Sequence, residues 1–131
     1  MIEVKGLKKE FNGLKVLNGI DYKIKQGEKI VVIGPSGSGK STFLRCLNLL
    51  EEPTSGAIFF DGADLAGKSV NIDLHRQKMG MVFQQFNLFN NMNVMRNLTV
   101  APTRIKKMPK DQAEEKAMEL LRKVGLADRA S

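Results

Sequence analysis

The chain has 131 residues, of which 42% are hydrophobic and 27% are charged, with a formal net charge of +7. This length and composition indicate one ordinary globular domain and argue against a disordered chain. The longest apolar runs are far shorter than a bilayer span, and the first five residues lack the apolar region of a secretory leader, so we expect a cytoplasmic location. The single cysteine, Cys46, excludes an intramolecular disulfide and is expected in the core.

The basic charge alone is compatible with nucleic acid, an acidic membrane surface or a phosphorylated ligand. The N-terminal lysines are dispersed, however, and no aromatic residues interleave with them as a base-stacking platform requires. We interpret them as a solvated strand face and do not expect nucleic-acid binding. These lysines are Lys5, Lys8, Lys9, Lys15, Lys23, Lys25 and Lys29.

Residues 20–25 alternate apolar and polar side chains and predict a half-buried antiparallel strand, closed by a turn at 26–28. Residues 30–33 form a continuous apolar run, which is typical of a buried parallel strand. Residues 41–50 are apolar at helical spacing. A turn segment at 51–56 then leads to a short predicted strand at 57–60 and another turn at 61–62.

The most informative motif lies between the apolar run and the first helix. Its residues, Gly34-Pro35-Ser36-Gly37-Ser38-Gly39-Lys40-Ser41, fit the phosphate-binding pattern G-x-x-x-x-G-K-[ST] without a gap. The glycines let backbone N–H groups turn inward to form an anion site, and the helix N-terminus adds its positive dipole. We expect Lys40 to reach the β- and γ-phosphates and the Ser41 hydroxyl to ligate Mg²⁺. The alternative is a merely flexible loop.

The middle of the chain predicts a short helical turn at 73–78 and an apolar strand at 80–83 that ends at Gln84. Ligands of such folds bind beyond the carboxyl ends of parallel strands, which places Gln84 near the phosphates. Its amide would there contact Mg²⁺ and an attacking water. Judged without a family, Gln84 is better explained as an ordinary polar loop residue.

Two helices are predicted near the C-terminus. Asn93 is the expected N-cap of a helix from about 93 to 101, which Pro102 should terminate or kink. A second helix spans about 109–124, with Pro109 in its first turn and Gly125 at its C-terminal end. It carries an ion pair of Glu119 with Lys123 and one apolar stripe of Ala113, Ala117, Leu120, Leu121 and Val124.

Together these motifs resemble the ATP-binding cassette, the motor subunit of ABC transporters. Besides the phosphate loop, the resemblance rests on residues 16–20, 27–28, 53–56, 59–62 and 81–84, and it covers the whole chain. Residues 83–89, 101–102 and 124–126 are most similar to ATPases of polar amino-acid importers. The resemblance implies an α/β fold, a P-loop NTPase core of mainly parallel sheet with a flanking antiparallel β subdomain. Residues 1–131 would form the N-terminal part of one such ATPase domain.

The resemblance also implies the binding residues. Phe11 matches the aromatic residue that stacks on adenine, and Val16 matches a residue near the ribose and base; without the family, Phe11 is equally a core or surface aromatic. Gln84 matches the Q-loop glutamine, which together with Ser41 would hold Mg²⁺. The segment from Phe86 to Asn93 looks like the surface that receives a membrane permease subunit. The phosphates of ATP would contact Gly34, Pro35, Ser36, Gly37, Ser38, Gly39, Lys40, Ser41 and Thr42.

The chain also departs from the family. The family pattern would continue beyond Ser131 into the Leu-Ser-Gly-Gly-Gln signature, the Walker B strand, the catalytic glutamate and the switch histidine. We therefore expect a truncated fold with uncovered sheet edges that self-associates, and we assign no general base. His75 is the only histidine and is expected at the surface. Asn90 to Asn93 replace the usual Pro-His-Met-Thr, and Arg96 replaces a frequent glutamate that would complete a capping box.

The resulting hypothesis is an ATPase on the inner face of the cell membrane that pairs head to tail with a second copy and uses Mg-ATP to power import of polar amino acids. The 131-residue chain by itself is expected to bind nucleotide weakly and to hydrolyse it negligibly. The alternatives are a non-hydrolysing nucleotide-binding module, an ABC ATPase for another solute, and an ABC protein of repair or translation that meets nucleic acid.

Overall fold

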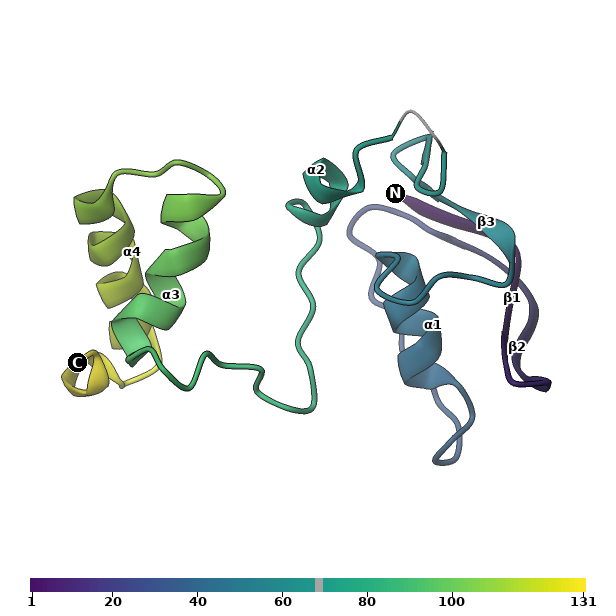
Figure 1. Ribbon diagram of the computed structural model, residues 1–131, viewed down its shortest axis with the longest axis horizontal. Coiled ribbons are helices and arrows are strands. Elements are labelled where there is room, and N and C mark those ends of the chain that lie inside the picture. The colour runs from purple at the N-terminus through teal and green to yellow at the C-terminus, as the bar shows by residue number, and fades with distance from the viewer. Residues whose placement is uncertain (68–69) are drawn as a thin grey trace. The chain divides into compact units, whose positions relative to one another are not determined.

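The structure is a computed structural model that describes residues 1–67 and 70–131. The chain divides into two compact units, Met1–Met81 and Val82–Ser131. Figure 1 traces both units, and each is described here by itself.

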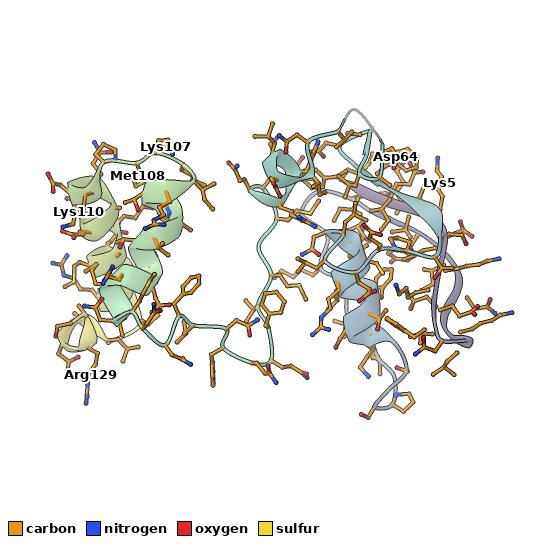
Figure 2. The ribbon with its side chains drawn as sticks, in the orientation of Figure 1. Lys5, Asp64, Lys107, Met108, Lys110 and Arg129 are labelled. Atoms are coloured by element: carbon orange, nitrogen blue, oxygen red, sulfur yellow. The ribbon has the colours of Figure 1, made fainter. Side chains whose placement is uncertain are left out.

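The first unit contains an antiparallel sheet in the strand order β2-β1-β3-β4. Its strands are β1 (Ile2–Phe11), β2 (Leu14–Ile24), β3 (Ser55–Phe60) and β4 (Ala63–Asp64). Val4 of β1 lies opposite Tyr22 of β2 on one side and Ile58 of β3 on the other. Lys5 and Asp64, both labelled in Figure 2, belong to β1 and β4. The predicted strands at 20–25 and 57–60 are confirmed within β2 and β3, and the predicted turn at 61–62 joins β3 to β4.

Helix α1 (Lys40–Leu47) follows the phosphate loop and packs on this sheet. It confirms the helix predicted at 41–50, although it ends three residues earlier. Cys46 is fully buried, as predicted. Burial raises the pKa of its thiol; Glu51 raises it further, and Lys9 partly offsets this. The core consists of Val4, Leu7, Leu17, Phe43, Cys46, Ile58 and Leu65.

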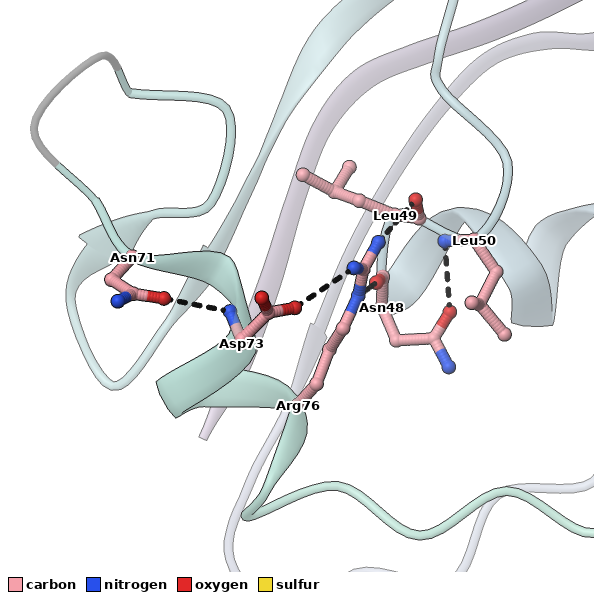
Figure 3. Close-up of polar contacts among 6 residues, drawn as sticks. All are labelled: Asn48, Leu49, Leu50, Asn71, Asp73 and Arg76. Carbon is pink, nitrogen blue, oxygen red and sulfur yellow. Dashed lines mark hydrogen bonds and ion pairs between the residues drawn. The ribbon is translucent and has the colours of Figure 1, made fainter. Parts of the chain in front are cut away.

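Helix α2 (Ile72–Arg76) begins at Asn71, whose side-chain oxygen accepts a hydrogen bond from the Asp73 N–H at 3.1 Å. Figure 3 shows that Arg76 extends from this helix to the backbone that follows α1. His75 was expected at the surface, but it is only partly exposed. Its ring packs edge-on against Phe60 with the centroids 5.9 Å apart, and its Nδ1 atom is buried without a partner among the described residues.

Two apolar segments predicted as parallel strands are not strands in this structure. Residues 28–35 and 79–83 have no regular secondary structure. A strand exists only where a neighbour completes its hydrogen bonds, and no strand in the described ranges pairs with either segment. Val31 and Ile33 consequently remain 80% and 89% exposed. The sheet that is present corresponds to the antiparallel part of the expected fold.

The second unit is helical, with α3 (Val94–Arg104), α4 (Lys110–Lys123) and the short 3₁₀ helix η1 (Ala127–Arg129). The Asn93 side chain accepts a hydrogen bond from the Arg96 N–H at 2.9 Å, which confirms the predicted N-cap. Pro102 does not terminate α3. The helix continues through Arg104, and the N–H of Ile105 still bonds to Ala101 O at 2.9 Å, because Pro102 removes only its own N–H from the helix.

Helix α4 packs against α3, side by side in Figure 1. Ala113, Ala117 and Leu121 are buried, whereas Leu120 and Val124 are 47% and 67% exposed, so the apolar stripe is narrower than predicted. The predicted ion pair is confirmed, with Lys123 Nζ 2.5 Å from Glu119 Oε1. Gly125 follows the helix end with φ of 71°, as a C-terminal cap requires. None of the helices in the described ranges is both long and apolar enough to cross a bilayer.

Candidate phosphate-binding site

The loop of residues 34–41 has the backbone that its glycines were expected to provide. Gly37 and Gly39 have φ values of 78° and 90°, a region that side chains with a Cβ rarely adopt. Gly34 is needed for a different reason, because a Cβ there would lie 2.6 Å from Ser38 Oγ. The three glycines thus allow a loop that turns tightly onto itself.

The Lys40 side chain folds back over this loop. Its ammonium group donates hydrogen bonds to the carbonyl oxygens of Pro35 at 2.7 Å and Gly34 at 2.8 Å, and Ser38 Oγ lies 3.5 Å away. Residues 34–42 contain no other charged side chain. The loop therefore holds one positive charge against its own backbone, without a carboxylate in the same segment to neutralise it.

The N-terminus of α1 adds to this positive potential. Gly39 is the N-cap, and in the described structure neither a side-chain cap nor an acidic residue occupies the first turn. Phe43 N–H bonds back to Gly39 O at 2.8 Å. Helix geometry leaves the earlier N–H groups, those of Lys40, Ser41 and Thr42, free to bind an anion. The Lys40 charge and these amides together suit a phosphate chain.

The β1–β2 hairpin carries the two residues expected near the base. A Cβ on Gly39 would lie 2.9 Å from Val16 Cγ1 and 3.1 Å from the Val16 carbonyl, so the structure brings Val16 into contact with the loop. Phe11 is the last residue of β1 and is 39% exposed. The Lys9 ammonium lies 4.6 Å from the centroid of its ring. The stacking role of Phe11 stays a prediction.

An apolar cavity of about 550 Å³ also borders the loop. Its walls include Leu17, Ile20 and Phe43 together with the segment 30–33, which no described strand covers. Neither Phe11 nor Val16 lines it. We assign this cavity to the uncovered side of the core rather than to the nucleotide base, because the two residues expected near the base are not among its walls.

The metal prediction depends on Ser41 and Gln84. The described residues include no group of three or more His, Cys, Asp or Glu side chains that could hold a metal alone. Mg²⁺ bound with a nucleotide takes most of its oxygen ligands from phosphate and water, so one exposed hydroxyl beside an anion site fits it. Gln84 is exposed and belongs to the second unit, and its contact with Mg²⁺ stays a prediction.

The segment expected to meet a membrane subunit, Phe86 to Asn93, exposes three large apolar side chains. Phe86, Leu88 and Phe89 are 90%, 63% and 54% exposed. Asn97 of α3 holds the end of this segment. Its Oδ1 accepts from Phe89 N–H at 2.8 Å, and its Nδ2 lies 3.0 to 3.2 Å from the carbonyl oxygens of Phe89, Met92 and Asn93.

Sequence reasoning missed Lys9, Arg76 and Asn97. Lys9 was counted among solvated lysines, yet it contacts Glu51, Glu52 and Phe11. Its glutamate partners lie 42 and 43 residues further along, so no local pattern could reveal them. Only the spacing of Asn97 four residues after the N-cap Asn93 was a local signal, and it also fits an ordinary helix position.

Comparison with known proteins agrees with the geometry. The family described as ABC transporter matches residues 17–131. The glutamine transport ATP-binding protein GlnQ of Escherichia coli (strain K12) is 52% identical over 130 residues, which cover 99% of this chain and 54% of that protein. The arginine transport ATP-binding protein ArtM of Bacillus subtilis (strain 168) is 49% identical over 129 residues, covering 98% and 54%. The chain spans about half the length of the curated relatives it matches.

Solved structures share the fold. A dimeric structure of the ATP-binding cassette MJ0796, in a post-hydrolysis state bound to ADP and Pi, aligns with a TM-score of 0.76 at 28% identity, covering 93% of this chain and 56% of that one. A second dimeric structure of MJ0796, described as a bacterial ABC transporter cassette, aligns with a TM-score of 0.79 at 31% identity over the same shares. These similarities confirm the expected fold class.

Proposed function

Because the chain belongs to the ABC transporter family, whose cassettes bind ATP, we propose that residues 34–42 bind the triphosphate of ATP together with Mg²⁺. The observation that supports this most is the Lys40 ammonium, held 2.7 and 2.8 Å from two loop carbonyls at the N-terminus of α1. Phosphate oxygens are stronger acceptors than carbonyls, so Lys40 exchanges these partners for the β- and γ-phosphates when the nucleotide binds.

The other loop residues act with Lys40. The N–H groups at the start of α1 donate to the phosphates, and their position is fixed by the loop before any ligand arrives. The Ser41 hydroxyl, with Gln84, would hold Mg²⁺, which when bound neutralises charge on the phosphates. Phe11 and Val16 would receive the adenine and ribose.

For the whole protein we propose ATP hydrolysis that powers import of a polar amino acid. The relatives named for glutamine and arginine transport support this substrate class. The dimeric MJ0796 structures support pairing with a second ATPase subunit, and we propose a head-to-tail arrangement. The exposed side chains of Phe86, Leu88 and Phe89 offer an apolar surface to a permease subunit at the inner face of the membrane.

The test is calorimetric titration of Mg-ATP into the protein, compared with Lys40→Ala. Losing a charged hydrogen-bonding partner of phosphate should weaken binding by about 10- to 100-fold. The matched control is Lys29→Ala, which removes one exposed positive charge close to the loop in sequence but outside the motif. Its affinity should stay close to that of the wild type, because an exposed charge contributes little.

Two results would refute the proposal. If Lys40→Ala binds Mg-ATP as tightly as the wild type, the loop is not the phosphate site. If Lys29→Ala loses as much affinity as Lys40→Ala, general positive charge, not the loop geometry, accounts for binding.

A further inference from the structure

The ammonium of Lys9 has three partners, two of them acidic or carbonyl oxygens and one an aromatic ring. It lies 2.5 Å from Glu51 Oε1, donates to Glu52 O at 2.8 Å, and sits 4.6 Å from the centroid of the Phe11 ring. The Lys9 side chain is only 13% exposed, whereas that of Lys5 on the same strand is 58% exposed. A lysine held on several sides has lost the freedom of an ordinary surface lysine.

This arrangement determines the position of the Phe11 ring. Phe11 ends β1 and is 39% exposed, so packing alone does not immobilise it. A cation over one face of a phenyl ring is attracted by the negative face of its π-system, and the attraction is stronger when water is excluded. Lys9 therefore occupies one face of the ring, and the ring keeps exposed area that a planar ligand can contact.

The same contacts connect the ring to the helix that binds phosphate. Glu51 and Glu52 follow α1 within five residues, and α1 begins at Lys40. Thr54 reinforces the connection, because its hydroxyl accepts from the Glu10 N–H at 3.0 Å and its N–H donates to the Lys8 carbonyl at 2.9 Å. The end of β1 is thereby tied to the segment that leaves α1.

We propose that Lys9 is a positioning residue for nucleotide-base recognition: it orients the Phe11 ring and fixes its distance from the phosphate loop. This inference rests on the proposed function, since it assumes that the loop binds the triphosphate and that Phe11 stacks on the base. It goes further in assigning part of the affinity for the base to a lysine that contacts neither the triphosphate nor the base. Its loss affects the base part of the ligand and leaves the phosphate part unchanged.

The experiment compares two ligands, Mg-ATP and inorganic tripolyphosphate with Mg²⁺, by calorimetry on the protein at its natural length. Lys9→Met should weaken ATP binding by about three- to tenfold and leave tripolyphosphate binding within about twofold. Lys9→Arg should recover most of the ATP affinity, because a guanidinium also pairs with carboxylates and stacks on rings. Glu51→Gln keeps the lysine but weakens its ion pair. It should lower the ATP affinity by less than Lys9→Met does and leave the tripolyphosphate affinity unchanged.

Lys5→Met is the matched control. Lys5 also lies on β1, 4.9 Å from the centroid of an aromatic ring, that of Phe59, and it pairs with Glu3 at 3.6 Å. The Lys5→Met substitution removes the same kind of contact with a different ring, away from Phe11 along the strand. It should change neither affinity.

A double mutant separates positioning from general stability. In a Phe11→Ala background, Lys9→Met should have no further effect on ATP affinity, because the ring that it positions is gone. A full additional loss in that background would overturn the inference, as would equal weakening of both ligands by Lys9→Met or by Glu51→Gln.

A wild-type protein that binds tripolyphosphate as tightly as ATP would also overturn the inference, while leaving the proposed role of the phosphate loop intact. A wild-type protein that binds neither ligand would overturn the proposed function as well.

Discussion

Arg76 donates a hydrogen bond from Nη2 to the carbonyl oxygen of Leu49 at 2.9 Å (Figure 3). Its Nε donates to the carbonyl oxygen of Asn48 at 3.0 Å. Helix α1 ends at Leu47, so the guanidinium satisfies carbonyls at the C-terminal end of the helix that begins in the phosphate loop. A positive charge at that end also interacts favourably with the negative end of the helix dipole. Arg76 thus stabilises the phosphate-binding helix from the end remote from the ligand.

We predict that Arg76→Met lowers the free energy of unfolding by about 1 to 3 kcal/mol, because two carbonyl groups lose a charged donor. The stability of Arg76→Lys should fall between those of the wild type and Arg76→Met, since an ammonium cannot present the planar fork of donors. Urea denaturation would measure both. Asp73→Asn should have little effect, because its carboxylate is 79% exposed where it meets Arg76 at 3.3 Å. A loss in Arg45→Met, an exposed arginine on α1, as large as that in Arg76→Met would contradict this account.

The second prediction compares two glycines of the phosphate loop. Both have positive φ, but a Cβ at Gly37 would meet nothing within 4 Å, whereas at Gly39 it would lie 2.9 Å from Val16 Cγ1. Gly37→Ala should therefore cost about 1 to 2 kcal/mol of backbone strain only. Gly39→Ala should cost more and should also displace Val16 from the loop. Thermal denaturation and ATP titration would test this, and equal effects of the two substitutions on both measurements would refute it.

The phosphate loop and several features of the helices could be predicted from local sequence. The loop motif, the N-cap Asn93 and the ion pair of Glu119 with Lys123 each depend on residues within eight positions of one another. The structure confirms the cap and the ion pair, and it gives the loop glycines a physical reason. Such features need no knowledge of the rest of the fold, because a turn or a helix determines which residues meet.

The remainder depends on contacts between distant segments. The apolar runs at 30–33 and 80–83 have the composition of buried strands, but a strand also requires a hydrogen-bonded neighbour, which composition does not supply. His75 is half-buried because Phe60, fifteen residues earlier, packs against it. The backbone and glutamate partners that Lys9 and Arg76 meet across the fold lie at least 27 residues away, so local sequence did not reveal these contacts.

The third prediction concerns Asn97, whose side chain holds the segment that ends at Asn93. Asn97→Ala removes the acceptor of the Phe89 N–H, so hydrogen exchange of that amide should accelerate by about tenfold. Exchange measured residue by residue by NMR would test it. Asn91→Ala replaces an exposed asparagine of the same segment and is the control. If Asn91→Ala accelerates exchange at Phe89 as much, the segment is not organised by Asn97.

The fourth prediction is a pH dependence. The Met1 ammonium donates to Asp61 Oδ1 at 2.6 Å, and this hydrogen bond is the main cause that lowers the pKa of the Asp61 carboxyl below its ordinary value of 3.8. A carboxyl that binds its proton less readily when folded stabilises the protein above the ordinary pKa, and the contribution is lost as the pH falls through the folded value.

At neutral pH, Asp61→Asn should unfold at lower urea than the wild type, and the difference should shrink to zero in acid. Acetylation of the Met1 amine should remove most of the difference, because Lys78 and His75 lower the pKa of Asp61 less than the Met1 ammonium does. As a control, Glu115→Gln, which removes an exposed carboxylate on α4, should leave the stabilising effect of Asp61 unchanged. A difference that acetylation does not reduce would show that Asp61 stabilises the protein mainly through another partner.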